Sequence, residues 1–308
     1  MTEQFELPDP VVRLGHVQEV ADDLLVIPNR GVPLVPDIGV IGGREAVLVV
    51  ETGMGPSNAE RVLGFAREVA KGRRIFLTTT HFHPEHAFGA QAFIGEATYL
   101  ANRAQAEDLR TKTTGYLHMF RGLGESIARR LEGVELTLPE LEYAAEHDLD
   151  LGGRIVHLRA TGPAHSRGDQ IITVPDAGVM FTGDLVETGQ FAIFPWFPPH
   201  DIDVTGLGWI AVMRRLIGQR PTTVVPGHGA VSGAEILGEV LAYLEDLRDE
   251  TWRRRDSAMS EVDIIAEVSA VLIERHPEWQ GREWLATGIS CLCAEHAAQQ
   301  SSEDSAIS

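Results

Sequence analysis

Residues 74–86 read RIFLTTTHFHPEH, an apolar run that leads directly into three histidines and a glutamate. The run 74–80 has the length and composition of a short buried strand. If this strand continues through His83, the side chains of His81 and His83 point to the same side, because side chains alternate along a strand with a period of two.

The residues that follow change the direction of the chain. Pro84 suits the first turn of a short helix, where its missing N–H is not needed. That turn would bring Glu85 and His86 to face a point next to the one faced by His81 and His83. The stretch therefore predicts two neighbouring metal positions.

Four other short segments hold residues that metal sites use. In the first, the acidic residue Glu51 follows an apolar run and precedes Thr-Gly. The other three are turn sequences that contain glycine together with a histidine or an aspartate. The segments are VETG at 50–53, TGPAHSRGD at 161–169, FTGD at 181–184 and VVPGHG at 224–229. Each alone is a common turn sequence, but together with the histidine cluster they form a specific pattern.

This ordered set resembles the signature of the metallo-β-lactamase superfamily, a His-x-His-x-Asp-His run followed by a distant His, Asp and His. The resemblance extends from about residue 20 to residue 232. It implies that the first metal is held by His81, His83 and His165, and the second by Glu85, His86 and His228. It further implies that Asp184 bridges both metals and that Asp169 supports a ligand or its loop.

Two positions depart from the family pattern. Glu85 stands where the family usually has aspartate, and Glu51 replaces the aspartate of an early Asp-Thr-Gly motif. Glutamate is one methylene longer, so Glu85 can still reach the second metal or instead serve as a proton shuttle. The second site could then be the weaker one. Neither departure removes a donor type.

The resemblance implies an α/β fold, a four-layer α/β/β/α sandwich with a helical C-terminal extension. The order of the patterns agrees: strands with a helix over 12–80, a helical insertion over 104–133, then strands and helices again. Glycines 115, 122 and 124 are expected to interrupt the insertion. We expect a catalytic domain at 12–233, the extension at 234–300 and a disordered tail at 301–308.

Composition restricts the partners. The formal net charge of −19 argues against nucleic acid, which needs a basic face, and no apolar run is long enough to cross a membrane. We expect a small-molecule substrate, and the sequence leaves open whether the chain forms a homo-oligomer. The acidic N-terminal sequence without an apolar run, and two cysteines expected as free thiols in a helix, indicate the cytoplasm.

The predicted function is that of a metallo-hydrolase, in which a hydroxide bridging two metals attacks a carbonyl carbon of a lactone, ester, thioester or lactam. Glu85 and Asp184 are the predicted catalytic residues. Imidazole and carboxylate ligands suit two zinc ions per chain, and iron or manganese would also bind such a set. The alternatives are a phosphodiesterase and an iron-dependent sulfur dioxygenase of the same fold.

Substrate contacts are predicted from two segments that could form the wall of a pocket. One is the loop FAIFPWFPPH at 191–200, which follows the predicted bridging aspartate, and the other is the helical insertion. The residues selected are Tyr116, Phe194, Trp196, Phe197 and His200.

Overall fold

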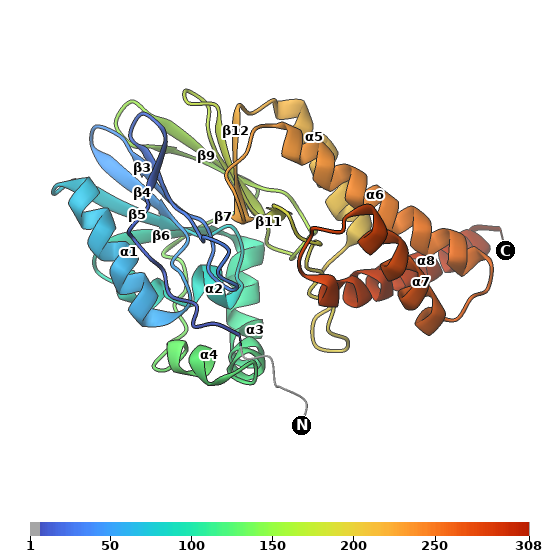
Figure 1. Ribbon diagram of the computed structural model, residues 1–308. Coiled ribbons are helices and arrows are strands. Elements are labelled where there is room, and N and C mark those ends of the chain that lie inside the picture. The colour runs from blue at the N-terminus through green and yellow to red at the C-terminus, as the bar shows by residue number, and fades with distance from the viewer. Residues whose placement is uncertain (1–6, 308) are drawn as a thin grey trace.

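Two β-sheets stack face to face, and helices cover the outer face of each in this computed structural model, which describes residues 7–307 (Figure 1). The first sheet has the strand order β1-β2-β3-β4-β5-β6-β7. Its first four strands are antiparallel, and β4 to β7 are parallel. The strands are β1 (Gln18–Ala21), β2 (Leu24–Ile27), β3 (Ile38–Gly42), β4 (Ala46–Val50), β5 (Arg74–Thr78), β6 (Ala97–Asn102) and β7 (Leu141–Tyr143).

The second sheet has the order β12-β11-β10-β9-β8. Its strands β8 to β11 are antiparallel, while β11 and β12 are parallel. The strands are β8 (Glu146–Asp150), β9 (Ile155–Ala160), β10 (Gln170–Val174), β11 (Val179–Glu187) and β12 (Thr223–His228). The parallel pair requires a crossover, which the helix following β11 supplies.

Helices form the outer layers (Figure 1). On the side of the first sheet lie α1 (Gly55–Ala70), α2 (Pro84–Ala87), the 3₁₀-helix η1 (Ala90–Phe93), α3 (Arg103–Arg121) and α4 (Glu125–Arg130). On the side of the second sheet lie α5 (Gly206–Gln219), α6 (Glu235–Asp256), α7 (Glu261–Arg275), the 3₁₀-helix η2 (Arg282–Trp284) and α8 (Leu285–Ile307).

Three apolar cores separate these layers, and they confirm the predicted four-layer α/β/β/α sandwich. One lies between α1 and the first sheet, one between the two sheets, and one between the second sheet and α5 to α8. The third core contains residues from both sides of the predicted boundary at 233/234. The C-terminal helices therefore share a core with the second half of the sandwich.

Three expectations about local structure need correction. The strand β5 ends at Thr78 rather than continuing to His83, so His81 and His83 lie in a loop. Gly115 does not interrupt α3, because one glycine costs only about 1 kcal/mol within a long helix. The helix α8 continues to Ile307, so residues 301–307 are helical instead of disordered; this segment holds no glycine or proline to end the helix.

Cys291 and Cys293 are free and buried in α8, as expected. Among residues 7–307, no helix combines the length and the apolar character that crossing a membrane requires. The cytoplasmic location stays a prediction.

Candidate metal centre

The loop that carries His81 and His83 is fixed by amide side chains of neighbouring elements. Gln170 of β10 donates its backbone N–H to the Thr80 carbonyl oxygen at 2.9 Å and its side-chain N–H to the Thr79 carbonyl oxygen at 2.7 Å. Gln105 of α3 donates to the same Thr79 oxygen at 3.1 Å. The backbone here is not paired in a strand, so these hydrogen bonds satisfy its carbonyl groups and fix its position.

The helix α2 presents Glu85 and His86, and Thr52 holds its end. The Thr52 backbone N–H and hydroxyl both donate to the His86 carbonyl oxygen, at 2.9 and 2.8 Å. Pro84 occupies the first turn, as predicted. Because α2 has only four residues, these contacts define the orientation of its side chains.

Asp184 lies in β11, next to two glycines at positions where a side chain does not fit. Gly183 has a φ of 53°, and a Cβ there would collide with the Thr80 side chain. A Cβ on Gly227 of β12 would collide with Asp184 Oδ1 itself. Gly227 of the PGHG segment is therefore required by the close approach of Asp184, and Gly183 of the FTGD segment by its left-handed backbone and the nearby Thr80 side chain.

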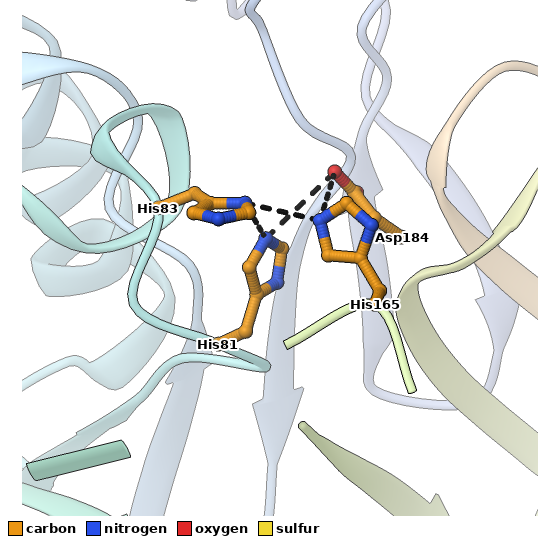
Figure 2. Close-up of side chains that lie close together, drawn as sticks. All are labelled: His81, His83, His165 and Asp184. Atoms are coloured by element: carbon orange, nitrogen blue, oxygen red, sulfur yellow. Dashed lines mark hydrogen bonds and ion pairs between the residues drawn. The ribbon is translucent and has the colours of Figure 1, made fainter. Parts of the chain in front are cut away.

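His81, His83, His165 and Asp184 form the first cluster (Figure 2). His83 Nδ1 lies 2.9 Å from His81 Nε2 and 3.0 Å from His165 Nε2. Asp184 Oδ2 lies 3.8 Å from His81 Nε2 and 3.7 Å from His165 Nε2. All four side chains are buried, and the three nitrogens and the oxygen converge on one point.

Glu85, His86, His228 and Asp184 form the second cluster. Asp184 Oδ1 lies 3.2 Å from His86 Nε2 and 3.6 Å from His228 Nε2. Asp184 thus points one oxygen at each cluster. All seven predicted ligands are brought together, within two groups whose ligand atoms lie no more than 4.8 Å apart.

The chemistry of both clusters fits bound cations. Glu85 Oε2 is buried and has no hydrogen-bond partner among residues 7–307, and the buried atoms His86 Nε2 and Asp184 Oδ1 form an ion pair at 3.2 Å without hydrogen-bond geometry. Such atoms are costly unless something binds them. A tetrahedral metal with nitrogens at about 2.0–2.1 Å separates its ligand atoms by roughly 3.3 Å, close to the spacings in the first cluster. The donor set and its spacing therefore suit two metal ions.

Most ligand imidazoles are held from behind by a second contact. His81 Nδ1 lies 3.1 Å from the Thr80 hydroxyl oxygen. His165 Nδ1 and His228 Nδ1 donate to the carbonyl oxygens of Ile193 and Val35, each at 2.9 Å. Such contacts leave the opposite nitrogen free to bind metal.

Two buried carboxyl groups, those of Glu51 and Asp169, contact the ligand His86 and the backbone next to His81 and His165. Glu51 Oε1 lies 3.4 Å from His86 Nδ1, and its two oxygens accept the Thr80 backbone N–H at 3.2 and 3.3 Å. Asp169 accepts the Ser166 backbone N–H at 2.9 Å, so it fixes the loop directly after His165. Both residues occupy the supporting places that their motifs implied.

Burial governs the protonation of the histidines. It lowers the pKa of His81 and His83 well below 6.5 and lowers the pKa of His165 to about 4. Burial also lowers the pKa of His86, but the Asp184 and Glu51 carboxylates outweigh it and leave that pKa raised. The first cluster therefore offers neutral imidazoles, the form that binds a cation.

The carboxyl groups respond in the opposite direction. Burial raises the pKa of Glu85 to about 7 and the pKa of Asp169 to about 7. For Asp184, burial raises the pKa, but His86 and His228 lower it more, and the net pKa lies well below 3.8. Asp184 is thus an anion at neutral pH, and Glu85 can take either form.

The residues predicted to contact substrate are placed differently from one another. Tyr116 stacks on His83 with ring centroids 5.1 Å apart. Trp196 and Phe197 are partly buried and His200 is exposed, so their contact with a substrate stays a prediction. Phe194 is a correction: its side chain has no exposed surface and packs against Trp209 in the third core, so it is a core residue.

An ion-pair group was not predicted from the sequence. Lys112 Nζ lies 3.3, 2.9 and 2.7 Å from carboxylate oxygens of Asp108, Asp201 and Asp203, and the Tyr116 hydroxyl donates to Asp201 at 2.7 Å. These contacts join α3 to the loop after β11. Single acidic residues in loops carry no signal of such pairing in one sequence.

Glu187 at the end of β11 was also missed. It is buried and accepts the Ile193 backbone N–H at 3.0 Å. An apolar strand that ends in glutamate gives no indication of where the carboxylate points.

Comparisons with known proteins agree with this geometry. Residues 31–228 match the family model described as the Metallo-beta-lactamase superfamily. Two mammalian proteins named acyl-coenzyme A thioesterase MBLAC2 are similar to this chain over 220 residues, with 26% identity for Bos taurus and 27% for Homo sapiens. Each match covers 65% of this chain and 75% of the relative.

A linear primary-alkylsulfatase of a Pseudomonas species is 23% identical over 260 residues. That match covers 74% of this chain and 49% of the relative, so the chain spans about half the length of the sulfatase. Among solved structures, a metallo-beta-lactamase from Pontibacter korlensis superimposes with a TM-score of 0.59 and 16% identity. It covers 75% of this chain and 98% of the other, which supports the fold alone.

Proposed function

The chain belongs to the metallo-β-lactamase superfamily, and we propose that it is a metal-dependent hydrolase that cleaves a carbonyl bond of a small molecule, with a thioester as the substrate class to test first. The observation that carries this proposal is the position of Asp184, whose two oxygens face two separate ligand clusters. The similarity to acyl-coenzyme A thioesterases favours a thioester over a lactone, ester or lactam.

Two divalent cations bound to these ligands, which we propose to be zinc, would lower the pKa of water and polarise a carbonyl group. Histidines 81, 83 and 165 would hold one cation, and Glu85, His86 and His228 the other. Asp184 would bind both and fix their separation. Its low pKa keeps the carboxylate charged over the whole neutral range.

Glu85 is the residue best placed to hold a proton. Its Oε2 atom is buried without a hydrogen-bond partner in the described part of the chain, and its pKa is raised to about 7 by burial. A carboxyl group that is half protonated near neutral pH can give a proton to a leaving group and regain it afterwards. This supports Glu85 as a general acid when it is not bound to the second metal, and as a metal ligand once its proton has left.

The test is a hydrolysis panel combined with metal analysis. Purified protein would be assayed with an acyl-coenzyme A thioester, a lactone, an aryl ester and a β-lactam, after chelation and after zinc addition. We expect thioester cleavage that is lost on chelation and restored by zinc. Full turnover in metal-free protein would refute the proposal.

The same panel separates the alternatives. A primary alkyl sulfate tests the chemistry named for the Pseudomonas relative, and a phosphodiester reporter tests nuclease-like chemistry, against which the net charge of −19 argues. Iron at one equivalent per chain with oxygen consumption on a persulfide would support a sulfur dioxygenase instead.

A further inference from the structure

Glu187 is a buried carboxylate that the proposed chemistry does not use. It ends β11, three residues after Asp184, and its exposed fraction is 4%. Burial and the nearby charge of Asp184 both raise its pKa, so placing it here is costly. A carboxylate at such a position needs a reason beyond packing, since an apolar residue would fill the space at lower cost.

The hydrogen bonds of Glu187 lead to a metal ligand. Oε2 accepts the Ile193 backbone N–H at 3.0 Å, and Oε1 accepts the Gln190 side-chain N–H. The carbonyl oxygen of the same Ile193 accepts Nδ1–H of His165 at 2.9 Å. The carboxylate, one residue of backbone and the imidazole therefore form a continuous chain of contacts.

Ile193 needs such an anchor because its segment has no regular structure. Residues 191–196 belong to no helix or strand, and no sheet ladder sets the direction of their carbonyl groups. Upstream, Phe191 donates its N–H to the Gln280 carbonyl oxygen at 3.0 Å. Glu187 supplies the next fixed point, directly at the residue whose carbonyl group faces His165.

The direction of that carbonyl group matters for the first cluster. A carbonyl oxygen can only accept, so His165 must carry its proton on Nδ1, and Nε2 is left as a lone pair. Nε2 is the atom that lies 3.0 Å from His83 Nδ1 in the first cluster. A rotation of the Ile193 backbone would remove the contact that sets both the tautomer and the ring orientation.

We propose that Glu187 is a positioning residue for the first metal, acting through the Ile193 backbone to hold His165 with Nε2 directed at the cluster. The proposal rests on the first cluster binding a metal ion, as the proposed function requires. In the usual arrangement a carboxylate contacts the ligand imidazole directly. Here the Ile193 backbone lies between the carboxyl group and the imidazole.

The main variant is Glu187→Met, which keeps the length of the side chain but replaces the oxygen acceptors by a weakly accepting thioether sulfur. Zinc affinity would be measured by competition with a chromogenic chelator, using folded protein verified by circular dichroism. We expect the zinc ion of the first cluster to bind about 10- to 100-fold more weakly, the range observed for partners of metal-ligating histidines. Binding of the zinc ion of the second cluster should be unaffected.

Two controls identify the cause. Glu187→Gln can still accept the Ile193 N–H through its amide oxygen, so its affinity for zinc should stay close to that of the wild type. Glu250→Gln alters another buried carboxylate, which pairs with Arg254 at 2.6 Å on α6 and makes no contact with either cluster. It should leave zinc affinity unchanged even if it lowers stability.

A spectroscopic measurement tests the geometry directly. In the zinc-loaded protein the His165 Nδ1–H should give a downfield proton resonance that is absent from His165→Ala and is shifted or lost in Glu187→Met. In wild-type protein the Ile193 amide should be protected from hydrogen exchange, a measurement that does not require any variant to fold.

The outcomes separate the two proposals. Wild-type protein that binds no metal would contradict the proposed function. Wild-type protein that binds zinc, together with a Glu187→Met variant of equal zinc affinity and unchanged His165 resonance, would overturn only the role of Glu187. An unprotected Ile193 amide, or a loss in Glu187→Gln as large as in Glu187→Met, would also overturn it.

Discussion

The two ligand clusters share Asp184 but differ in how their other ligands are held. In each cluster one histidine donates its Nδ1–H to a backbone carbonyl oxygen at 2.9 Å, His165 to Ile193 and His228 to Val35. Only in the second cluster does a carboxylate lie behind a ligand imidazole, with Glu51 Oε1 at 3.4 Å from His86 Nδ1. Asp184 lies 3.7 and 3.8 Å from His165 and His81 of the first cluster, but 3.2 and 3.6 Å from His86 and His228 of the second.

This difference has a chemical consequence. Apart from Asp184, the ligands of the first cluster are neutral imidazoles whose pKa values burial lowers, so little competes with a metal ion there at neutral pH. The second cluster includes Glu85, whose pKa is raised to about 7, so protons compete for it. We therefore expect a tight first site and a weaker, pH-dependent second site.

The largest effect should come from the residue that both clusters share. Asp184→Asn keeps the shape but removes the charge, so both sites lose an anionic ligand. We expect metal content to fall from two ions to one or fewer, and kcat/KM to fall about a thousandfold, because metal ions supply several kcal/mol of charge stabilisation. Elemental analysis and thioester kinetics measure this, with the exposed Asp176→Asn as the matched control.

Two single variants, each lacking one ligand imidazole, should show whether the two sites bind metal independently. His165→Ala should abolish the tight site, whereas His228→Ala should keep one tightly bound ion and lose the other. Each loss should exceed the 10- to 100-fold that partners of ligands contribute. Stepwise zinc titration against a chelator distinguishes them, and equal loss of both ions in both variants would mean that the sites are not separable.

The support behind the second cluster should have a smaller effect. Glu51→Gln removes the charge that lies 3.4 Å from His86 Nδ1. We expect the weaker zinc to bind about 10- to 100-fold less tightly, with the tighter zinc unchanged. If instead the tighter zinc were lost, Glu51 would be acting mainly through its hydrogen bonds to the Thr80 backbone, beside His81.

The pH dependence of the second site follows from Glu85 and His86, because both have raised pKa values and must lose a proton to bind a metal. The folded pKa of Glu85, about 7, lies above the ordinary 4.5, so the carboxyl group is protonated below about pH 7 and binding of a metal must displace that proton. Affinity for the weaker zinc should fall as pH falls, by up to about tenfold per pH unit below 7. In Glu85→Gln the affinity should be low and its fall with pH should become shallower, with the remaining dependence due to His86, whose pKa Asp184 and Glu51 raise. Titration at several pH values measures both slopes.

The convergence of the seven candidate ligands was predictable from the sequence, because metal binding restricts residue type and order. The six residues at 81–86 and the segments around His165, Asp184 and His228 predicted the two groups that the structure brings together and the four-layer fold. The supporting contacts were only partly predictable. Glu51 and Asp169 belong to motifs, whereas Glu187 acts through a backbone group that has no sequence signal.

Side-chain direction in loops was the main source of error. The strand pattern at 74–80 suggested that His81 and His83 share a strand face, but the strand ends at Thr78 and the amides of Gln105 and Gln170 shape the loop. Likewise, aromatic composition could not distinguish Phe194, which is in the core, from Trp196, which is partly exposed. Such choices depend on long-range packing that one sequence does not encode locally.

The smallest effect should come from Tyr116, whose ring stacks on His83 of the first cluster. Tyr116→Phe keeps the ring that stacks on His83 but removes the hydrogen bond to Asp201, which retains Lys112 at 2.9 Å. We expect the free energy of unfolding to fall by about 1–2 kcal/mol in urea denaturation. Zinc affinity should change much less than the tenfold typical of a direct partner of a ligand, because His83 keeps its ring contact. If Tyr116→Phe weakened the tight site tenfold or more, α3 would be part of the metal centre, and the first cluster would depend on the fold around it more than the second does.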